Sequence, residues 1–99
     1  MTVEDDIGDM LSAVDKEILV SLLLCGADSP HNLARYTSRH KQTIQERLGK
    51  LQDEELVRNK GAGVYDVTYQ GLNFGRVLLK DTQIADKIDC GASTLNERG

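Results

Sequence analysis

Aromatic side chains and long apolar runs are scarce in this sequence of 99 residues, which has no tryptophan, one phenylalanine and three tyrosines. Aliphatic residues must therefore supply most of the core. The longest apolar run, residues 18–25, is interrupted by Ser21 and is too short to span a bilayer. Residues 4–6 are all acidic, which is the wrong charge for the start of a signal peptide. We therefore expect one folded cytoplasmic domain without a membrane segment.

Metal-binding motifs are also missing. Cys25 and Cys90 lie far apart in the sequence, and neither has a cysteine or histidine partner at the spacing of a zinc site. His31 and His40 have no ligand partner at such a spacing either, so we interpret both as ordinary polar residues. Because disulfides are rare in a reducing cytosol, we expect none here: Cys25 is predicted to be a small buried apolar residue and Cys90 to be exposed.

The sequence contains no recognisable enzyme active site. It has no phosphate-binding loop, no G-x-S-x-G, no H-E-x-x-H and no nucleophile with an evident base. Asp5, Asp6 and Asp9 fit a solvated terminus better than an acid/base pair. We therefore expect a protein that is not an enzyme, with no cofactor, no metal and no evident small-molecule ligand.

The net charge of −4 is unevenly distributed. Residues 1–30 carry one lysine against seven acidic residues, whereas residues 31–60 carry seven lysines and arginines against four acidic residues. Residues 61–99 are close to neutral, with four basic and five acidic residues. The middle third is therefore basic although the protein is acidic, which is a distribution compatible with nucleic-acid binding by that third.

Three helices are predicted in the first half of the chain. The first spans residues 13–25, with Ser12 and Asp15 as a capping box and Gly26 as its end. The second, residues 30–36, begins with the capping hydroxyl of Ser29 followed by Pro30. After a turn at 37–39, the third helix spans about residues 40–53, with apolar residues on one face only: Ile44, Leu48 and Leu51.

A hairpin and a last helix follow. Residues 56–60 and 64–68 read as strands around a glycine-containing tip at 61–63. Thr68 can cap a helix that begins at Tyr69 and continues to about Asp89. The predicted fold is mainly α with a small β-hairpin. The predicted divisions are a flexible acidic N-terminus (1–11), one domain (12–80), and a helical extension with a disordered tail (81–99).

Three motifs give this order of elements a family resemblance. Leu33 and Ala34 precede the apolar face of the third helix at the spacing of a helix-turn-helix core. Residues 48–57 read L-x-x-L-x-D-E-x-L-V, and residues 65–71 read Y-x-V-T-x-x-G. The chain thus resembles winged helix-turn-helix proteins, in particular the archaeal regulators grouped with the phi-H phage repressor, and more loosely the multiple-antibiotic-resistance-regulator superfamily. The resemblance implies a transcription regulator, usually a homodimeric repressor on operator DNA.

The sequence departs from that family at its turns. Ser38 occupies the position usually held by glycine between the two helices, and its neighbours Thr37 and Arg39 replace apolar residues. Glu55 stands where a glycine commonly follows the third helix. These departures concern the edges of the third helix, which determine which of its polar residues face outward.

The polar face of the third helix supplies the candidate DNA-binding residues. Glutamine pairs with adenine, arginine with guanine, and a threonine methyl packs on thymine, whereas charges at helix ends and in the hairpin contact phosphates or the minor groove. The predicted DNA-binding residues are Arg39, Lys41, Gln42, Thr43, Gln45, Arg47, Lys50, Arg58 and Lys60. The competing interpretation is an ordinary solvated helix face. Glu46 fits either interpretation, because its carboxylate could accept from cytosine N4 or pair with Lys50.

The last helix has two interpretations. Its apolar stripe could pack on the first helix of the same chain, or it could form the interface of a homodimer; the stripe comprises Phe74, Leu78, Ala85 and Ile88. A chain this short has limited room to bury many apolar residues, which favours a dimer. The acidic net charge leaves open a different function, a winged helix that binds protein partners in a transcription-related complex and no DNA.

Overall fold

The computed structural model describes residues 11–91, so the predictions for residues 1–10 and 92–99 lie outside the described residues. Within that range the protein is mainly helical, with one two-stranded antiparallel hairpin. The elements in chain order are α2 (Ala13–Cys25), α3 (Pro30–Thr37), α4 (Lys41–Asp53), β1 (Val57–Gly61), β2 (Val64–Val67), α5 (Tyr69–Leu78) and α6 (Thr82–Ala85). The predicted fold class is confirmed at this level.

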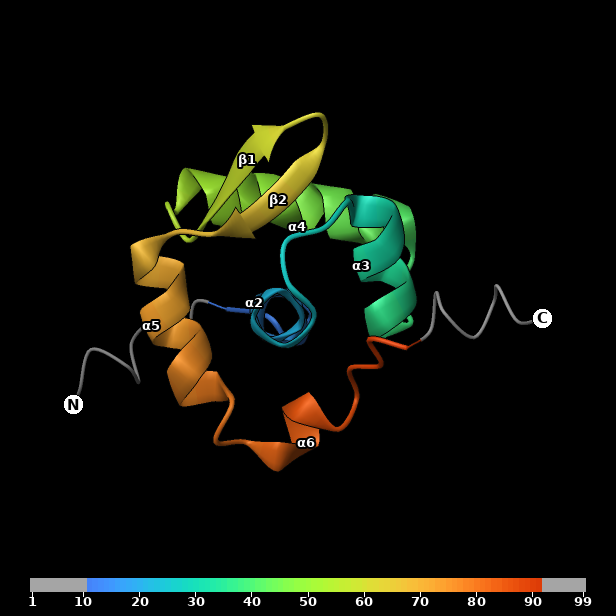
Figure 1. Ribbon diagram of the computed structural model, residues 1–99, viewed down its shortest axis with the longest axis vertical. Helices are drawn as coiled ribbons and strands as arrows, with labels where there is room; N and C mark the ends of the chain where they lie inside the picture. Colours follow the sequence, from blue (N-terminus) through green and yellow to red (C-terminus); the bar gives the residue numbers. More distant parts are fainter. Residues whose placement is uncertain (1–10, 92–99) are drawn as a thin grey trace.

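Helix α2 is the centre of the molecule. Figure 1 views it almost end-on, with α3, α4, the hairpin, α5 and α6 arranged around it. Ile18, Leu19 and Val20 are fully buried, because neighbours cover this helix on several sides. The capping box forms as predicted, since the Ser12 hydroxyl accepts from the Asp15 N–H and the Asp15 carboxylate accepts from the Ser12 N–H.

Helices α3 and α4 pack on α2 as a pair joined by a tight turn. Leu33, Ile44 and Leu48 are fully buried in the shared core. Ser29 caps α3 and Pro30 lies in its first turn, as predicted. Ser38 takes the left-handed conformation that the turn requires (φ 57°), and its N–H donates to the carbonyls of Ala34 and Arg35. The sequence therefore makes the turn without glycine.

The hairpin is attached to the rest of the molecule at both ends. At its base, the Thr68 N–H donates to the Leu56 carbonyl, and Glu55 is left-handed like Ser38 (φ 62°). Asp28, in the loop between α2 and α3, forms an antiparallel bridge with Tyr65 through N–O distances of 3.1 and 2.8 Å. Tyr65 also packs half-buried against the core. These contacts fix the hairpin relative to the α3–α4 pair.

The prediction of one last helix to Asp89 is wrong. Helix α5 ends at Leu78, and the Asp81 side chain caps the separate short helix α6 by accepting from the Gln83 N–H. The chain thereby turns back toward α2 (Figure 1). The predicted stripe is consequently not one helix face: Phe74, Leu78 and Ile88 pack half-buried on the core of their own chain.

The prediction that the two cysteines are not linked is also wrong. Cys25 ends α2, Cys90 follows α6, and the two form a disulfide across a Cα–Cα distance of 5.4 Å. They meet because the chain after α6 returns to α3, where the Asp89 N–H donates to the Tyr36 carbonyl at 2.9 Å.

Two buried glycines let α5 approach its neighbours closely. A Cβ on Gly71 would collide with the backbone carbonyl of Leu56, and one on Gly75 would lie 2.7 Å from the Leu23 methyl groups. The Leu56 carbonyl is part of the hairpin base and cannot rotate away as a side chain can. Gly71 therefore determines how closely α5 packs on the hairpin.

We expect Gly71→Ala to lower the free energy of unfolding by about 2 kcal/mol or more, because the clash is with backbone. Gly49 is the matched control: it lies in the exposed middle of α4, and a Cβ there would touch nothing within 4 Å. Gly49→Ala should stabilise the protein by about 0.5–1 kcal/mol through helix propensity. Urea unfolding of both variants tests the pair, and equal stability of the two would contradict this packing.

Candidate nucleic-acid interface

Helix α4 has a buried apolar side and an exposed polar side. Ile44, Leu48 and Leu51 are fully buried, whereas the residues that face away are exposed: Lys41, Gln42, Gln45, Glu46, Gly49 and Lys50. Its first turn contains no acidic residue, and His40 provides no side-chain cap. The N-terminal half of this face therefore offers amide groups, an ammonium group and the positive end of the helix dipole.

An open groove of about 490 Å³ adjoins this face. Three segments line it: the start of α3, the α4 residues Lys41 and Gln45, and the hairpin near Gly63. The groove thus joins two predicted contact residues on α4 to the tip of the hairpin. The start of α3 contributes the exposed His31 and the positive end of a second helix.

Two of the predicted cations lie on the hairpin and point outward. Arg58 and Lys60 are exposed on β1. Lys60 lies at a register shift, because Asn59 pairs with Tyr65 and Gly61 pairs with Val64, which leaves Lys60 without a partner across the hairpin. Bulges of this kind redirect a side chain. At the tip, Ala62 and Gly63 both have positive φ, 58° and 75°.

Arg47, predicted to read a base, is held by another residue. Its Nε and Nη2 donate to the two carboxylate oxygens of Asp15, both at 2.7 Å. The Asp15 side chain is 1% exposed and that of Arg47 is 31% exposed. Burial alone would raise the pKa of Asp15, but the hydrogen bonds from Arg47 and Ser12 and the charge of Arg47 outweigh it and lower the pKa. Arg47 thus joins α4 to the start of α2.

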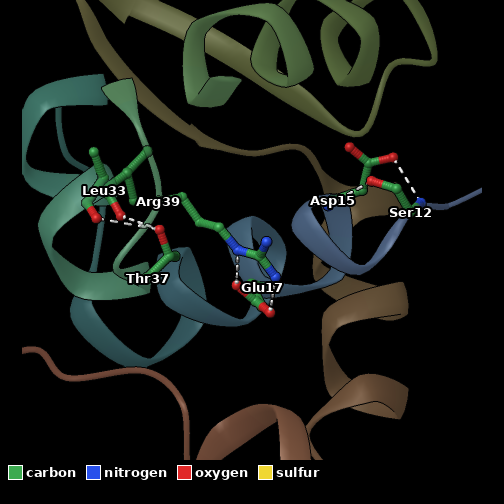
Figure 2. Close-up of polar contacts among 7 residues, drawn as sticks. Ser12, Asp15, Glu17, Leu33, Thr37 and Arg39 are labelled. Carbon is green, nitrogen blue, oxygen red and sulfur yellow. Dashed lines mark hydrogen bonds and ion pairs between the residues drawn. The ribbon is translucent and has the colours of Figure 1, made fainter. Parts of the chain in front are cut away.

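Arg39, predicted to contact phosphate, has a similar partner. Its Nε and Nη2 donate to the two carboxylate oxygens of Glu17 at 3.0 and 2.9 Å. Figure 2 shows this fork, with the Thr37 hydroxyl nearby directed at the Leu33 carbonyl. Thr37 is buried, and that bond of 2.8 Å satisfies its hydroxyl. The side chains of Thr37 and Arg39 therefore bind other residues of the protein.

Asp28 connects three parts of the site. Its carboxylate accepts from the Tyr36 hydroxyl at 2.6 Å, the Asn32 side chain at 2.8 Å and the Ser29 N–H at 2.8 Å. Burial acts to raise the pKa of Asp28, yet these hydrogen bonds lower it overall. Since the Asp28 backbone also pairs with Tyr65, the residue holds the hairpin to α3.

The remaining predicted residues divide by position. Thr43 is half-buried and lies away from the groove lining, while Lys50 is exposed near the other end of α4 and lines a smaller hollow of about 180 Å³ with Phe74 and Gln70. Sequence reasoning missed Asp15, Glu17 and Asp28 as partners. The available signal was two carboxylates on an apolar helix, because buried acids require a partner.

Comparisons with protein families, with curated proteins and with solved structures found no match to this chain. In the part of the chain that the structure describes, no helix is long and apolar enough to cross a membrane. The same residues form no cluster of histidine, cysteine and acidic side chains suited to a metal ion. The function must therefore be inferred from the geometry of α4, the groove and the hairpin.

Replacing Arg47 with alanine should destabilise the free protein by about 2 kcal/mol or more, because it leaves the buried Asp15 carboxylate unpaired. The partial exposure of the guanidinium keeps the expected cost below that of a fully buried pair. Lys50→Ala, on the exposed face of the same helix, is the control and should change stability by about 0.5 kcal/mol at most. If thermal unfolding of Arg47→Ala matches the wild type, the ion pair has no structural role.

Acid should weaken the fold through Asp15 and Asp28. Both have a lower pKa in the folded protein than in the unfolded chain, so the folded state binds fewer protons. Their contribution is present above the unfolded pKa, about 3.9, and is lost as the pH falls through the folded-state values. Urea unfolding between pH 7 and pH 2.5 should show a shallower acid loss in Asp15→Asn and Asp28→Asn. An unchanged acid slope in the double variant would refute this assignment.

Proposed function

We propose that the protein is a winged helix-turn-helix regulator of transcription that binds duplex DNA. In this proposal α3 and α4 form the helix-turn-helix and the hairpin, residues 57–67, is the wing. The observation that carries it is the two-sided character of α4: a fully buried apolar side, and an exposed side whose Lys41 and Gln45 share a groove with the hairpin tip. An α-helix with such a polar side fits the major groove of B-DNA.

The roles on α4 follow from what each side chain contacts. Gln42 and Gln45 are exposed and have the amide groups that pair with adenine. Lys41 and Lys50, together with the N-terminus of α3, are suited to phosphates, which position the protein without reading sequence. Arg39 and Arg47 hold the helix in place through Glu17 and Asp15. The base-reading residues are therefore glutamines rather than arginine.

The wing supplies a second contact. Arg58 and Lys60 are exposed on β1, which leads to the tip that lines the groove, and the small residues at the tip allow close approach to the DNA backbone or the minor groove. The local net charge of +3 over residues 31–60 favours this orientation of the acidic protein toward DNA. Regulation of transcription, repression in particular, and a cytoplasmic location belong to the same proposal.

The proposal includes a homodimer. Because Phe74 and Leu78 pack on the core of their own chain, the exposed side of α5, with Tyr69 and Val77, is the better interface surface. Two chains would bind a palindrome with half-sites about 34 Å apart.

Selection from a random DNA library should yield a palindromic site. Gln45→Ala should weaken binding to that site by about 1–3 kcal/mol and affect non-specific DNA little, while Lys41→Ala should weaken both and reduce the salt slope by about 1. Gln52→Ala is the control, an exposed glutamine in the last turn of α4 that lies away from the groove lining. Fluorescence anisotropy at several salt concentrations measures affinity and the number of chains bound.

Two results would count against this function. Equal losses from Gln45→Ala and Gln52→Ala would mean that α4 does not read bases through its N-terminal half. Absence of binding at low salt, where phosphate contacts are strongest, would favour the alternative of a winged helix that binds protein partners.

A further inference from the structure

The disulfide attaches the segment that follows α5 to the end of α2. Residues 82–91, here called the strap, comprise α6 and the chain that follows it to Gly91. None of these residues is fully buried, and α6 has only four residues, too few for a helix that is stable alone. The strap is attached through the packing of α6 on α2, the half-buried Ile88, the Asp89–Tyr36 hydrogen bond and the Cys25–Cys90 bond.

The strap also lies beside the turn between α3 and α4. Lys87 lines one hollow together with Glu17, Ser38 and Arg39. The Asp89 N–H donates to the carbonyl of Tyr36, one residue before the end of α3. The strap therefore lies next to the turn that precedes α4.

The two cysteines of the disulfide differ in exposure. Cys90 is exposed, whereas Cys25 is half-buried at the end of α2. A thiolate from solvent therefore has its approach at the Cys90 sulfur. Cys90 belongs to the strap, whereas Cys25 ends α2 and packs half-buried against the core.

We propose that the Cys25–Cys90 disulfide holds the strap in place and that reduction of this bond releases the strap. A dithiol reductant attacks the Cys90 sulfur, forming a mixed disulfide and releasing Cys25 as a thiolate that takes up a proton. The second thiol of the reductant then displaces Cys90, so two cysteine thiols and one oxidised dithiol result. The reduced strap detaches from the turn while the helices and the hairpin stay folded. Nothing in this inference requires DNA binding.

Limited trypsin digestion of the oxidised and the dithiothreitol-reduced protein tests the proposal. Cleavage after Lys87, which is in the strap, should become at least tenfold faster on reduction, because proteolysis follows local opening. Cleavage after Arg47, in the middle of α4, should stay unchanged. Mass spectrometry after alkylation should count two additional free thiols in the reduced form.

Cys90→Ser is the matched variant, and it should show the fast cleavage after Lys87 with or without dithiothreitol. Equal cleavage after Lys87 in the oxidised and reduced wild-type protein would overturn the proposal. So would a parallel increase after Arg47, because the bond would then hold the whole fold rather than the strap. Retention of the disulfide in dithiothreitol would also overturn it, since the bond would not be accessible to a dithiol.

Discussion

Two buried carboxylates on the central helix determine where the outer helices lie. Asp15 and Glu17 are 1% and 3% exposed and each accepts both ends of an arginine fork, from Arg47 and Arg39 respectively. A carboxylate removed from water needs such a partner, because the cost of its desolvation is otherwise uncompensated. The geometry of a bidentate pair also fixes orientation more strictly than apolar contact does. Helix α4 and the turn before it are thereby held in register with α2.

The same pairs divide the polar residues of α4 into two groups. Arg47 points toward α2, whereas Lys41, Gln42 and Gln45 remain exposed beside the groove and the hairpin. Each ion pair neutralises one carboxylate and one arginine, and the lysines of α4 remain as exposed cations. Asp28 extends the arrangement to the hairpin by joining the α2–α3 loop to β2.

Local features were predictable from sequence and distant ones were not. The Ser12 and Ser29 caps, Pro30 and the period of Ile44, Leu48 and Leu51 depend on residues close in the chain, and the corresponding helices lie where predicted. The roles of Arg39 and Arg47 depend on partners 22 and 32 positions away, and the disulfide on one 65 positions away. Apolar periodicity continues through Leu79 to Ile88, so it gave no sign that Asp81 begins a new helix. The sequence alone therefore could not distinguish the exposed polar residues of α4 from Arg39 and Arg47, whose side chains bind carboxylates on α2.

The exposed residues of α4 and the residues that attach the helix to α2 are different, which affects how such a protein can change over evolution. Positions 41, 42 and 45 are exposed and carry no core residue, while positions 44, 47, 48 and 51 hold the helix to α2. Substitutions at the first set leave packing untouched, so new side chains can be sampled there without loss of foldability. Substitutions at Arg47 are tolerated only together with a change at Asp15, which couples two distant codons. The exposed residues of α4 can thus change while the residues that attach the helix to α2 stay the same.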